Sequence, residues 1–185
     1  MKGMFVNADG FDFADAIVRG DKVIETRNRA MLDKLIGERV AVVRTKRGRK
    51  PEVIGTVFVK FAFHFGPKDF EIYREDTLIP KGSKYDCTEK GKWCYFLRDA
   101  ERCEPYPLPE NAVRHGISWV EFDGPGEKTI HRAGAVWMAR DGERMDWEEN
   151  LGVFISAKTG EIYEQAERIG DDCIVVCGAV ERSGK

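Results

Sequence analysis

The chain has 185 residues, of which 42% are hydrophobic, 34% are charged and 11% are aromatic. This composition suits one folded domain with an appendage and excludes disordered, collagen-like and coiled-coil chains. With 30 basic and 32 acidic residues, the net charge of -2 argues against a polybasic nucleic-acid binder. There is neither an apolar run of roughly 18 residues nor a signal-peptide core, so we expect a cytoplasmic protein with no membrane partner.

Charged residues and cysteines are unevenly placed along the chain. Residues 1–121 carry 22 basic and 19 acidic side chains, whereas residues 122–185 carry 8 and 13. The five cysteines form an odd set without a Cys-x-x-Cys pair, and the three histidines are far apart. This pattern favours reduced, buried thiols over a disulfide framework or a zinc site. We therefore expect neither a metal nor a cofactor.

The first part of the chain predicts two short strands and two helices. Residues 4–6 indicate a strand, and Asp12 is placed to cap a short helix that ends at Gly20. A helix of barely two turns is not stable alone, so it must pack on a sheet. Residues 22–27 are typical of the next strand. Four apolar residues then recur with helical spacing: Met31, Leu32, Leu35 and Ile36.

The middle of the chain is rich in β-branched and aromatic residues. Residues 39–44 and 53–61 predict a hairpin with a basic connecting loop. Residues 64–92 are rich in turn signals and indicate loops, and residues 92–97 indicate another strand. The three prolines of residues 104–109 predict a rigid connector, because each proline removes a backbone donor.

The pattern of elements predicts an α+β fold with a C-terminal extension. Residues 117–122 alternate like a half-buried strand, and Asp123-Gly-Pro-Gly126 is the best candidate boundary. Three or four further strands are indicated beyond it. We expect a small, strongly bent sheet or barrel over residues 1–122, and an acidic, β-rich extension over residues 123–185 that packs on it.

The most informative motif lies on the second predicted strand. Residues 13–27 contain Gly20-x-Lys22-x-x-Glu25-x-Arg27 behind a short helix. This spacing resembles the G-x-K-x-x-E-x-R signature of the ASCH family, a branch of the PUA-like β-barrels. The resemblance extends over about residues 1–122 and has no counterpart in residues 123–185. It implies a PUA-like small barrel with short helices, and it directs the functional hypotheses to RNA and modified nucleosides.

The motif residues form a candidate ligand site. Alternation along a strand places Glu25 and Arg27 on one face, and Gly20 lets Lys22 turn toward them. A carboxylate between two cations keeps all three groups charged and can hold a phosphate or a base edge. We add Tyr85, in a predicted loop, as a ligand-binding and stacking residue. The same charged set is also typical of a solvated surface cluster with weak ion pairs.

A hydrolase is the alternative to a binding module. Some ASCH-like proteins are amidohydrolases that remove the acetyl group from acetylcytidine, with a threonine where this motif has Glu25 and the motif lysine beside it. Thr26 is one residue further along and faces the other side of the strand by alternation. We therefore assign the role of general base to Glu25 and charge stabilisation to Lys22. Nuclease activity, attributed to some relatives, gives RNA as another substrate.

Two charged surfaces complete the sequence hypotheses. The predicted hairpin carries five residues that we assign to contacts with an RNA backbone: Arg44, Lys46, Arg47, Arg49 and Lys50. A charged hairpin tip that keeps a sheet edge soluble is the alternative. The acidic side chains of residues 123–185 give a third hypothesis, a surface for a protein partner or an intramolecular cover for the basic face.

Overall fold

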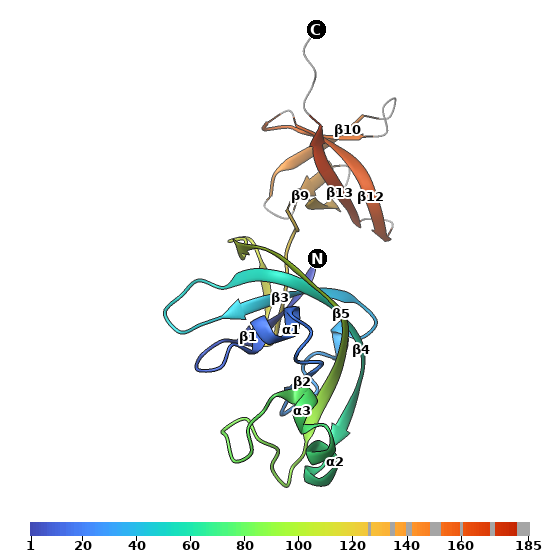
Figure 1. Cartoon of the computed structure of the whole chain (residues 1–185). Helices are drawn as coiled ribbons and strands as arrows, with labels where there is room; N and C mark the ends of the chain where they lie inside the picture. Colours follow the sequence, from blue (N-terminus) through green and yellow to red (C-terminus); the bar gives the residue numbers. More distant parts are fainter. Residues whose placement is uncertain are drawn as a thin grey trace. The chain divides into compact units, whose positions relative to one another are not determined.

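The structure is a computed structural model of the chain. It describes residues 1–125, 127–133, 136–139, 142–148, 153–159, 161–170 and 173–180. The chain divides into two compact units, Met1–Phe122 and Asp123–Lys185 (Figure 1). The helices in the described part of the chain are all short, and none combines the length and the apolar character that a membrane crossing requires.

The first unit is built on one seven-stranded sheet with the strand order β2-β5-β4-β3-β1-β7-β6. Its strands are β1 (Lys2–Asn7), β2 (Ile24–Arg27), β3 (Arg39–Thr45), β4 (Glu52–Phe65), β5 (Lys92–Pro107), β6 (Val113–His115) and β7 (Trp119–Glu121). Its helices are α1 (Phe13–Val18), α2 (Pro67–Ile72), α3 (Arg74–Thr77) and the 3-10 turn η1 (Asp33–Leu35). Short helices on a mainly β core confirm the α+β class.

The barrel expected for this unit is wrong, because its sheet stays open. Within this fully described unit, β2 pairs with β5 alone, and β1 pairs with β7 only through Lys2–Met4. The backbone N–H of Phe5 still donates to the backbone oxygen of Ser118 at 2.9 Å, and beyond this bond β1 borders a seam in the sheet. A side chain spans that seam: Nη2 of Arg27 on β2 donates to the backbone oxygen of Phe5 at 2.6 Å. Polar side chains thus stand where a closed barrel would continue its backbone hydrogen bonds.

The first helix forms as its sequence predicts. The Asp12 side chain accepts a hydrogen bond from the backbone N–H of Asp15 at 2.9 Å, which satisfies one of the free donors at the helix start. The apolar stripe is buried, with Ile17 fully covered. Gly20 follows with a φ of +81°, a left-handed conformation that suits glycine and turns the chain back toward β2.

The helix expected over Met31–Ile36 is wrong. The structure has only the single turn η1, and Ile36 is already extended, with φ -65° and ψ 132°. Leu32 and Leu35 are fully buried, and the backbone N–H of Leu32 donates to the hydroxyl oxygen of Tyr95 at 3.2 Å. One turn therefore suffices to bury both leucines and to satisfy the backbone.

The prediction that residues 64–92 form only loops is also wrong, because this segment contains α2 and α3. Pro67 takes the first position of α2, where a helix needs no backbone donor. The proline signalled a helix start, whereas a loop was expected. Leu78 ends α3 in a left-handed conformation with a φ of 54°.

The proline-rich segment over residues 104–109 is not only a connector, because β5 continues to Pro107. Beyond Phe96, β5 pairs with β4 alone in this fully described unit. A proline that faces the unpaired side of a strand costs no sheet hydrogen bond. The prolines are therefore compatible with the strand at this one-sided stretch.

Apolar residues cover both faces of the sheet. Strand β3 shows this directly, because Val40 and Val42 belong to one core cluster and Ala41 and Val43 to another. The first cluster includes residues of α1 and η1. A strand buried on both faces has a continuous apolar run, which explains why β3 lacks polar alternation.

The second unit has six strands in its described residues, paired as a closed barrel in the order β10-β11-β12-β13-β8-β9. They are β8 (Glu127–Ala133), β9 (Val136–Ala139), β10 (Arg144–Glu148), β11 (Val153–Ser156), β12 (Ile162–Gly170) and β13 (Cys173–Val180). Its core includes Met145, Phe154 and Val176. The side chains of Cys173 and Cys177 and most of the acidic side chains lie outside the described residues, so their roles stay predictions.

Candidate functional site

A cavity of about 460 Å³ opens in the first unit along the edge of β2. Its wall includes Phe5–Asn7 of β1, Glu25–Arg27 of β2 and the Gly116–Ser118 turn before β7. Because β1 and β2 are not neighbours in the sheet, the cavity occupies the open seam between them. It is lined by all four residues that the sequence assigns to a ligand site, namely Lys22, Glu25, Arg27 and Tyr85.

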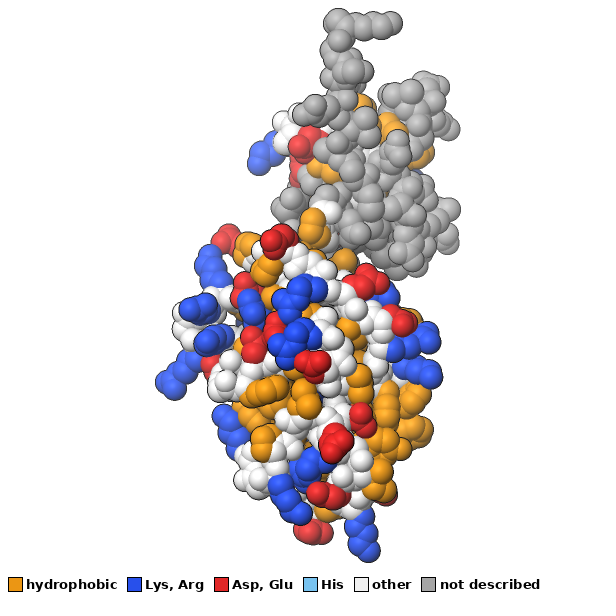
Figure 2. All heavy atoms as spheres, in the orientation of Figure 1, with side chains coloured by type: hydrophobic (Ala, Val, Ile, Leu, Met, Phe, Trp, Pro, Cys, Tyr) orange, Lys and Arg blue, Asp and Glu red, His pale blue; other side chains and the backbone are white. Residues whose placement is uncertain are grey.

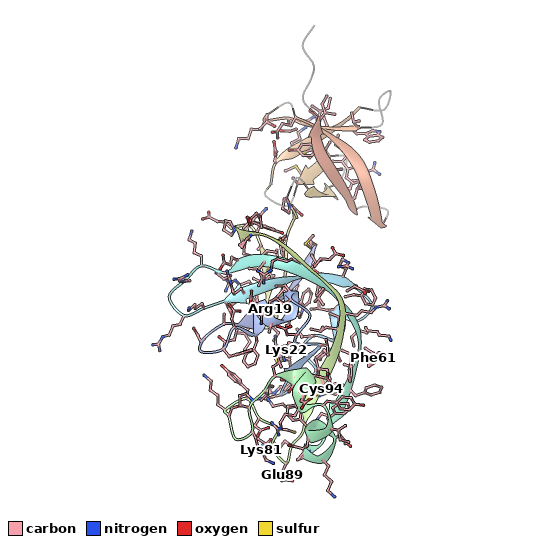
Figure 3. All side chains as sticks on the ribbon, in the orientation of Figure 1. Arg19, Lys22, Phe61, Lys81, Glu89 and Cys94 are labelled. Atoms are coloured by element: carbon pink, nitrogen blue, oxygen red, sulfur yellow. The ribbon has the colours of Figure 1, made fainter. Side chains whose placement is uncertain are left out.

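Lys22, which Figure 3 labels, lines this cavity, and only 2% of its surface is exposed. Its ammonium donates to the backbone oxygens of Ile24 at 2.6 Å and of Thr77 at 2.7 Å. The same nitrogen lies 3.5 Å from Oε2 of Glu25. Burial lowers the pKa of Lys22, and Glu25 acts in the opposite direction. Lys22 is therefore fully engaged within the protein and holds Glu25 in place.

Glu25 and Arg27 form the second half of the cluster. Glu25 is 5% exposed, and its Oε1 accepts a hydrogen bond from Nη1 of Arg27. Arg27 uses its other terminal nitrogen to reach the backbone oxygen of Phe5 across the seam. The carboxylate thus lies between two cations, each of which is anchored to a backbone carbonyl. This arrangement fixes the Glu25 side chain at the cavity wall.

Tyr85 supplies an aromatic wall from the loop before β5. Its hydroxyl oxygen accepts a hydrogen bond from Nδ2 of Asn7 at 2.6 Å, which ties the loop to β1. Its ring meets the ring of Phe13 edge to face, with centroids 5.7 Å apart. The ammonium of Lys84 lies 4.8 Å from the Tyr85 ring centroid. The cavity therefore combines charged groups with aromatic surface.

Sequence reasoning missed several residues that also line the cavity. Thr26 borders it, because β2 is an edge strand and residues of both its faces contribute to the wall. Lys92, only 6% exposed, lines it from the start of β5. The pairing of β2 with β5 brings it there, because Arg27 stands opposite Trp93, next to Lys92, and no motif in the sequence signals this pairing.

The charge of the cavity wall is strongly one-sided. Within this fully described unit, one carboxylate, that of Glu25, lines the cavity. Five cations line it: Lys22, Arg27, Lys84, Lys92 and Arg114. An excess of cations in a partly buried site attracts anions, because a low-dielectric wall screens charge less than water does.

Two thiols near Lys92 add no charge at neutral pH. Burial raises the pKa of Cys94 to about 12 and also raises the pKa of Cys87. Both groups are therefore protonated at pH 7. Among the described residues, no three His, Cys, Asp or Glu side chains gather in a cluster that could hold a metal ion.

The five basic residues assigned to RNA lie on the β3–β4 hairpin, and none of them lines the cavity. Arg44 is engaged within the protein: its Nε and Nη2 donate to Oε1 of Glu52 at 2.9 and 2.7 Å. Lys46, Arg47, Arg49 and Lys50 are exposed on the connecting loop, and Figure 2 shows basic side chains projecting there. The structure therefore separates one structural arginine from four accessible cations.

No protein-family model matches this sequence, and no curated protein matches it. Among solved structures, the chain is similar to ASCH from Zymomonas mobilis, with 22% identity over 60% of this chain and 75% of that chain and a TM-score of 0.47. It is also similar to a mutant form of that protein, with 21% identity over 60% of this chain and 79% of that chain and a TM-score of 0.48. These likenesses assign no ligand or reaction to this chain.

Proposed function

We propose that this protein binds RNA or a modified nucleoside in the cavity along β2. The observation that carries the proposal is the meeting of the Lys22–Glu25–Arg27 cluster with the Tyr85 ring at one cavity. A volume of about 460 Å³ falls within the range of small-molecule sites. Charged groups beside an aromatic wall suit a ligand that has both polar edges and a flat ring.

Glu25 is the group best placed to recognise a base edge. Both terminal nitrogens of Arg27 donate to protein acceptors, and Lys22 donates to two backbone oxygens. The Oε2 atom of Glu25 is held more loosely, at 3.5 Å from the Lys22 ammonium. A fixed carboxylate oxygen accepts hydrogen bonds from exocyclic amino groups such as that of cytosine. The two cations then act as positioning groups for the carboxylate.

Stacking supplies the second element of recognition. Unpaired bases stack on aromatic side chains, and each such contact contributes about 1 to 3 kcal/mol. The Tyr85 ring lines the cavity and is held by Asn7 and Phe13. For an RNA ligand, the four exposed cations of the hairpin loop would add contacts to the phosphate backbone that do not depend on sequence.

A hydrolase is the second candidate, because the cavity holds a buried carboxylate that a water-activating mechanism requires. In that reaction water would add to the acetyl carbon of acetylcytidine, the bond from that carbon to nitrogen would break, and acetate and cytidine would leave. Oε1 of Glu25 already accepts the hydrogen bond from Arg27, and Oε2 lies 3.5 Å from the Lys22 ammonium, so both carboxylate oxygens are engaged within the protein. This geometry favours a binding role over that of a base.

The test is a titration of the full chain with cytidine, acetylcytidine, CMP and a short single-stranded RNA. Tyr85→Ala should weaken binding about tenfold or more through the lost stacking. Tyr73→Ala is the matched control, because Tyr73 does not line the cavity in this fully described unit. Absence of binding by all four ligands, or an equal loss in both variants, would overturn the proposal. Release of acetate that stops in Glu25→Gln would replace binding with hydrolysis.

A further inference from the structure

Lys92 is a buried cation for which the cavity offers no protein partner. It begins β5 opposite Phe65 of β4, lines the cavity and is only 6% exposed. Within the described residues, its ammonium makes neither a hydrogen bond nor an ion pair. An ammonium group carries three donors, and burying it without acceptors is costly. Lys92 therefore needs an acceptor that the protein does not supply.

Lys22, in the same cavity, is a buried lysine whose ammonium has acceptors within the protein. Its ammonium has two backbone oxygens within 2.7 Å and the Glu25 carboxylate at 3.5 Å. Burial lowers the pKa of Lys92 as well, while Glu25 acts in the opposite direction. The two lysines are similarly buried, but among the described residues only Lys22 has hydrogen-bond partners. A structural role is thus visible for Lys22, whereas nothing in the fold uses the charge of Lys92.

Among the described residues, no group near Lys92 supplies a countercharge that is free of other partners. Glu25, which is the only carboxylate lining the cavity in this fully described unit, is already held by Arg27 and Lys22. The thiols of Cys87 and Cys94 are protonated at pH 7 because burial raises the pKa of each. A countercharge for Lys92 would therefore have to come from a ligand.

We infer that Lys92 binds a phosphate group, so that the ligand of the cavity is a nucleotide or an RNA phosphate rather than a free nucleoside. This inference rests on the proposed function and names its ligand class. The five cations that face one carboxylate provide the field that such a ligand requires. Lysine is a common phosphate contact, because a compact ammonium acts as a point charge. Lys84 and Arg114 are exposed cations of the same wall and would attract the anion toward the cavity.

The experiment compares cytidine with CMP in the full chain and in Lys92→Met. The wild type should bind CMP about tenfold or more tightly than cytidine, as expected for a charge-assisted hydrogen bond. Lys92→Met should lose this preference and keep its affinity for cytidine. Lys90→Met is the matched control, because Lys90 is an exposed lysine two residues away that does not line the cavity in this fully described unit. It should keep the preference.

A second measurement separates ligand binding from a structural role. Inorganic phosphate should raise the melting temperature of the wild type and compete with CMP, and Lys92→Met should lose both effects. Without ligand, Lys92→Met should melt at the wild-type temperature or above it, because it removes an unpaired buried charge. A lower melting temperature with an unchanged preference for CMP would show a structural lysine and overturn the inference.

The ligand series also distinguishes the sources of the phosphate. Binding of a short RNA but not of CMP, with loss in Lys92→Met, supports the inference with RNA as the source. Equal affinity of the wild type for cytidine and CMP would overturn the inference and leave the proposed function intact. Failure of cytidine, acetylcytidine, CMP and RNA alike would overturn both.

Discussion

The cavity and the hairpin loop are both rich in cations, yet they differ in what those cations can do. In the cavity, Lys22 and Lys92 are 2% and 6% exposed, whereas Lys46 and Arg47 on the loop are exposed to solvent. Exposed charges are screened by salt and suit phosphate contacts without sequence preference. Buried charges must be paired, and their partners fix geometry. Burial therefore distinguishes the candidate binding site from the candidate attractive surface.

The largest expected effect is on stability, in Lys22→Met. This change removes two hydrogen bonds to backbone oxygens and leaves the buried Glu25 with Arg27 as its remaining cation. Breaking a buried pair by removing one partner costs about 3 to 5 kcal/mol in the free energy of unfolding. Urea unfolding of the full chain measures this loss of stability. Hydrogen exchange of peptides from residues 1–122 assigns the loss to the first unit.

The matched control for this stability prediction is Lys46→Met on the exposed loop. It should change the free energy of unfolding by no more than about 0.5 kcal/mol. The double variant Lys22→Met with Glu25→Gln should recover part of the loss, because the carboxylate no longer needs a partner. Equal stabilities of Lys22→Met and Lys46→Met would contradict the contrast between the two regions.

The second prediction concerns RNA affinity and its salt dependence. Replacing all four exposed loop cations by alanine should weaken RNA binding and reduce the slope of log K against log salt by about 3, at roughly 0.7 per phosphate contact with a single strand. The affinity for CMP should stay unchanged, because none of the four lines the cavity in the fully described first unit. Fluorescence anisotropy at several salt concentrations measures both. A parallel loss of CMP affinity would show that the cavity and the hairpin loop act as one binding site.

Elements with local signals were predictable from the sequence. The Asp12 cap and Gly20 delimit α1, and the β3–β4 hairpin follows its β-branched runs. Errors arose where tertiary contacts override local pattern. The turn η1 ends at Leu35, where Ile36 is extended and the backbone N–H of Gly37 donates to the backbone oxygen of Val59 at 2.7 Å, and β5 runs through its prolines because one side of it is free. Neither fact is readable from residue order.

The candidate site was predictable in its motif and not in its surroundings. The spacing from Gly20 to Arg27 placed three charged side chains near one another, as the structure shows. It could not show that Lys22 reaches a carbonyl of α3, that Arg27 spans an open seam, or that Lys92 lines the same cavity. These contacts join segments distant in the chain, and only the path of the sheet brings them together.

The smallest expected effect concerns pH, and it extends the contrast to a titratable thiol near the cavity. Cys94 is fully buried, and burial raises its pKa from 9.0 to about 12. Between these values the unfolded chain releases the thiol proton while the folded protein keeps it. The contribution of Cys94 to stability is therefore complete below pH 9 and falls by about 1.4 kcal/mol per pH unit above it.

The difference in the free energy of unfolding between wild type and Cys94→Ala isolates this contribution. Subtraction is needed because Lys22 and Lys92, whose pKa values are lowered by burial, change stability in the opposite direction with rising pH. The difference should be constant from pH 6 to 8 and should shrink from pH 9 upward. A difference that stays constant to pH 11 would mean that the Cys94 thiol titrates as it does in water. Water would then reach Cys94 as freely as it reaches the hairpin loop.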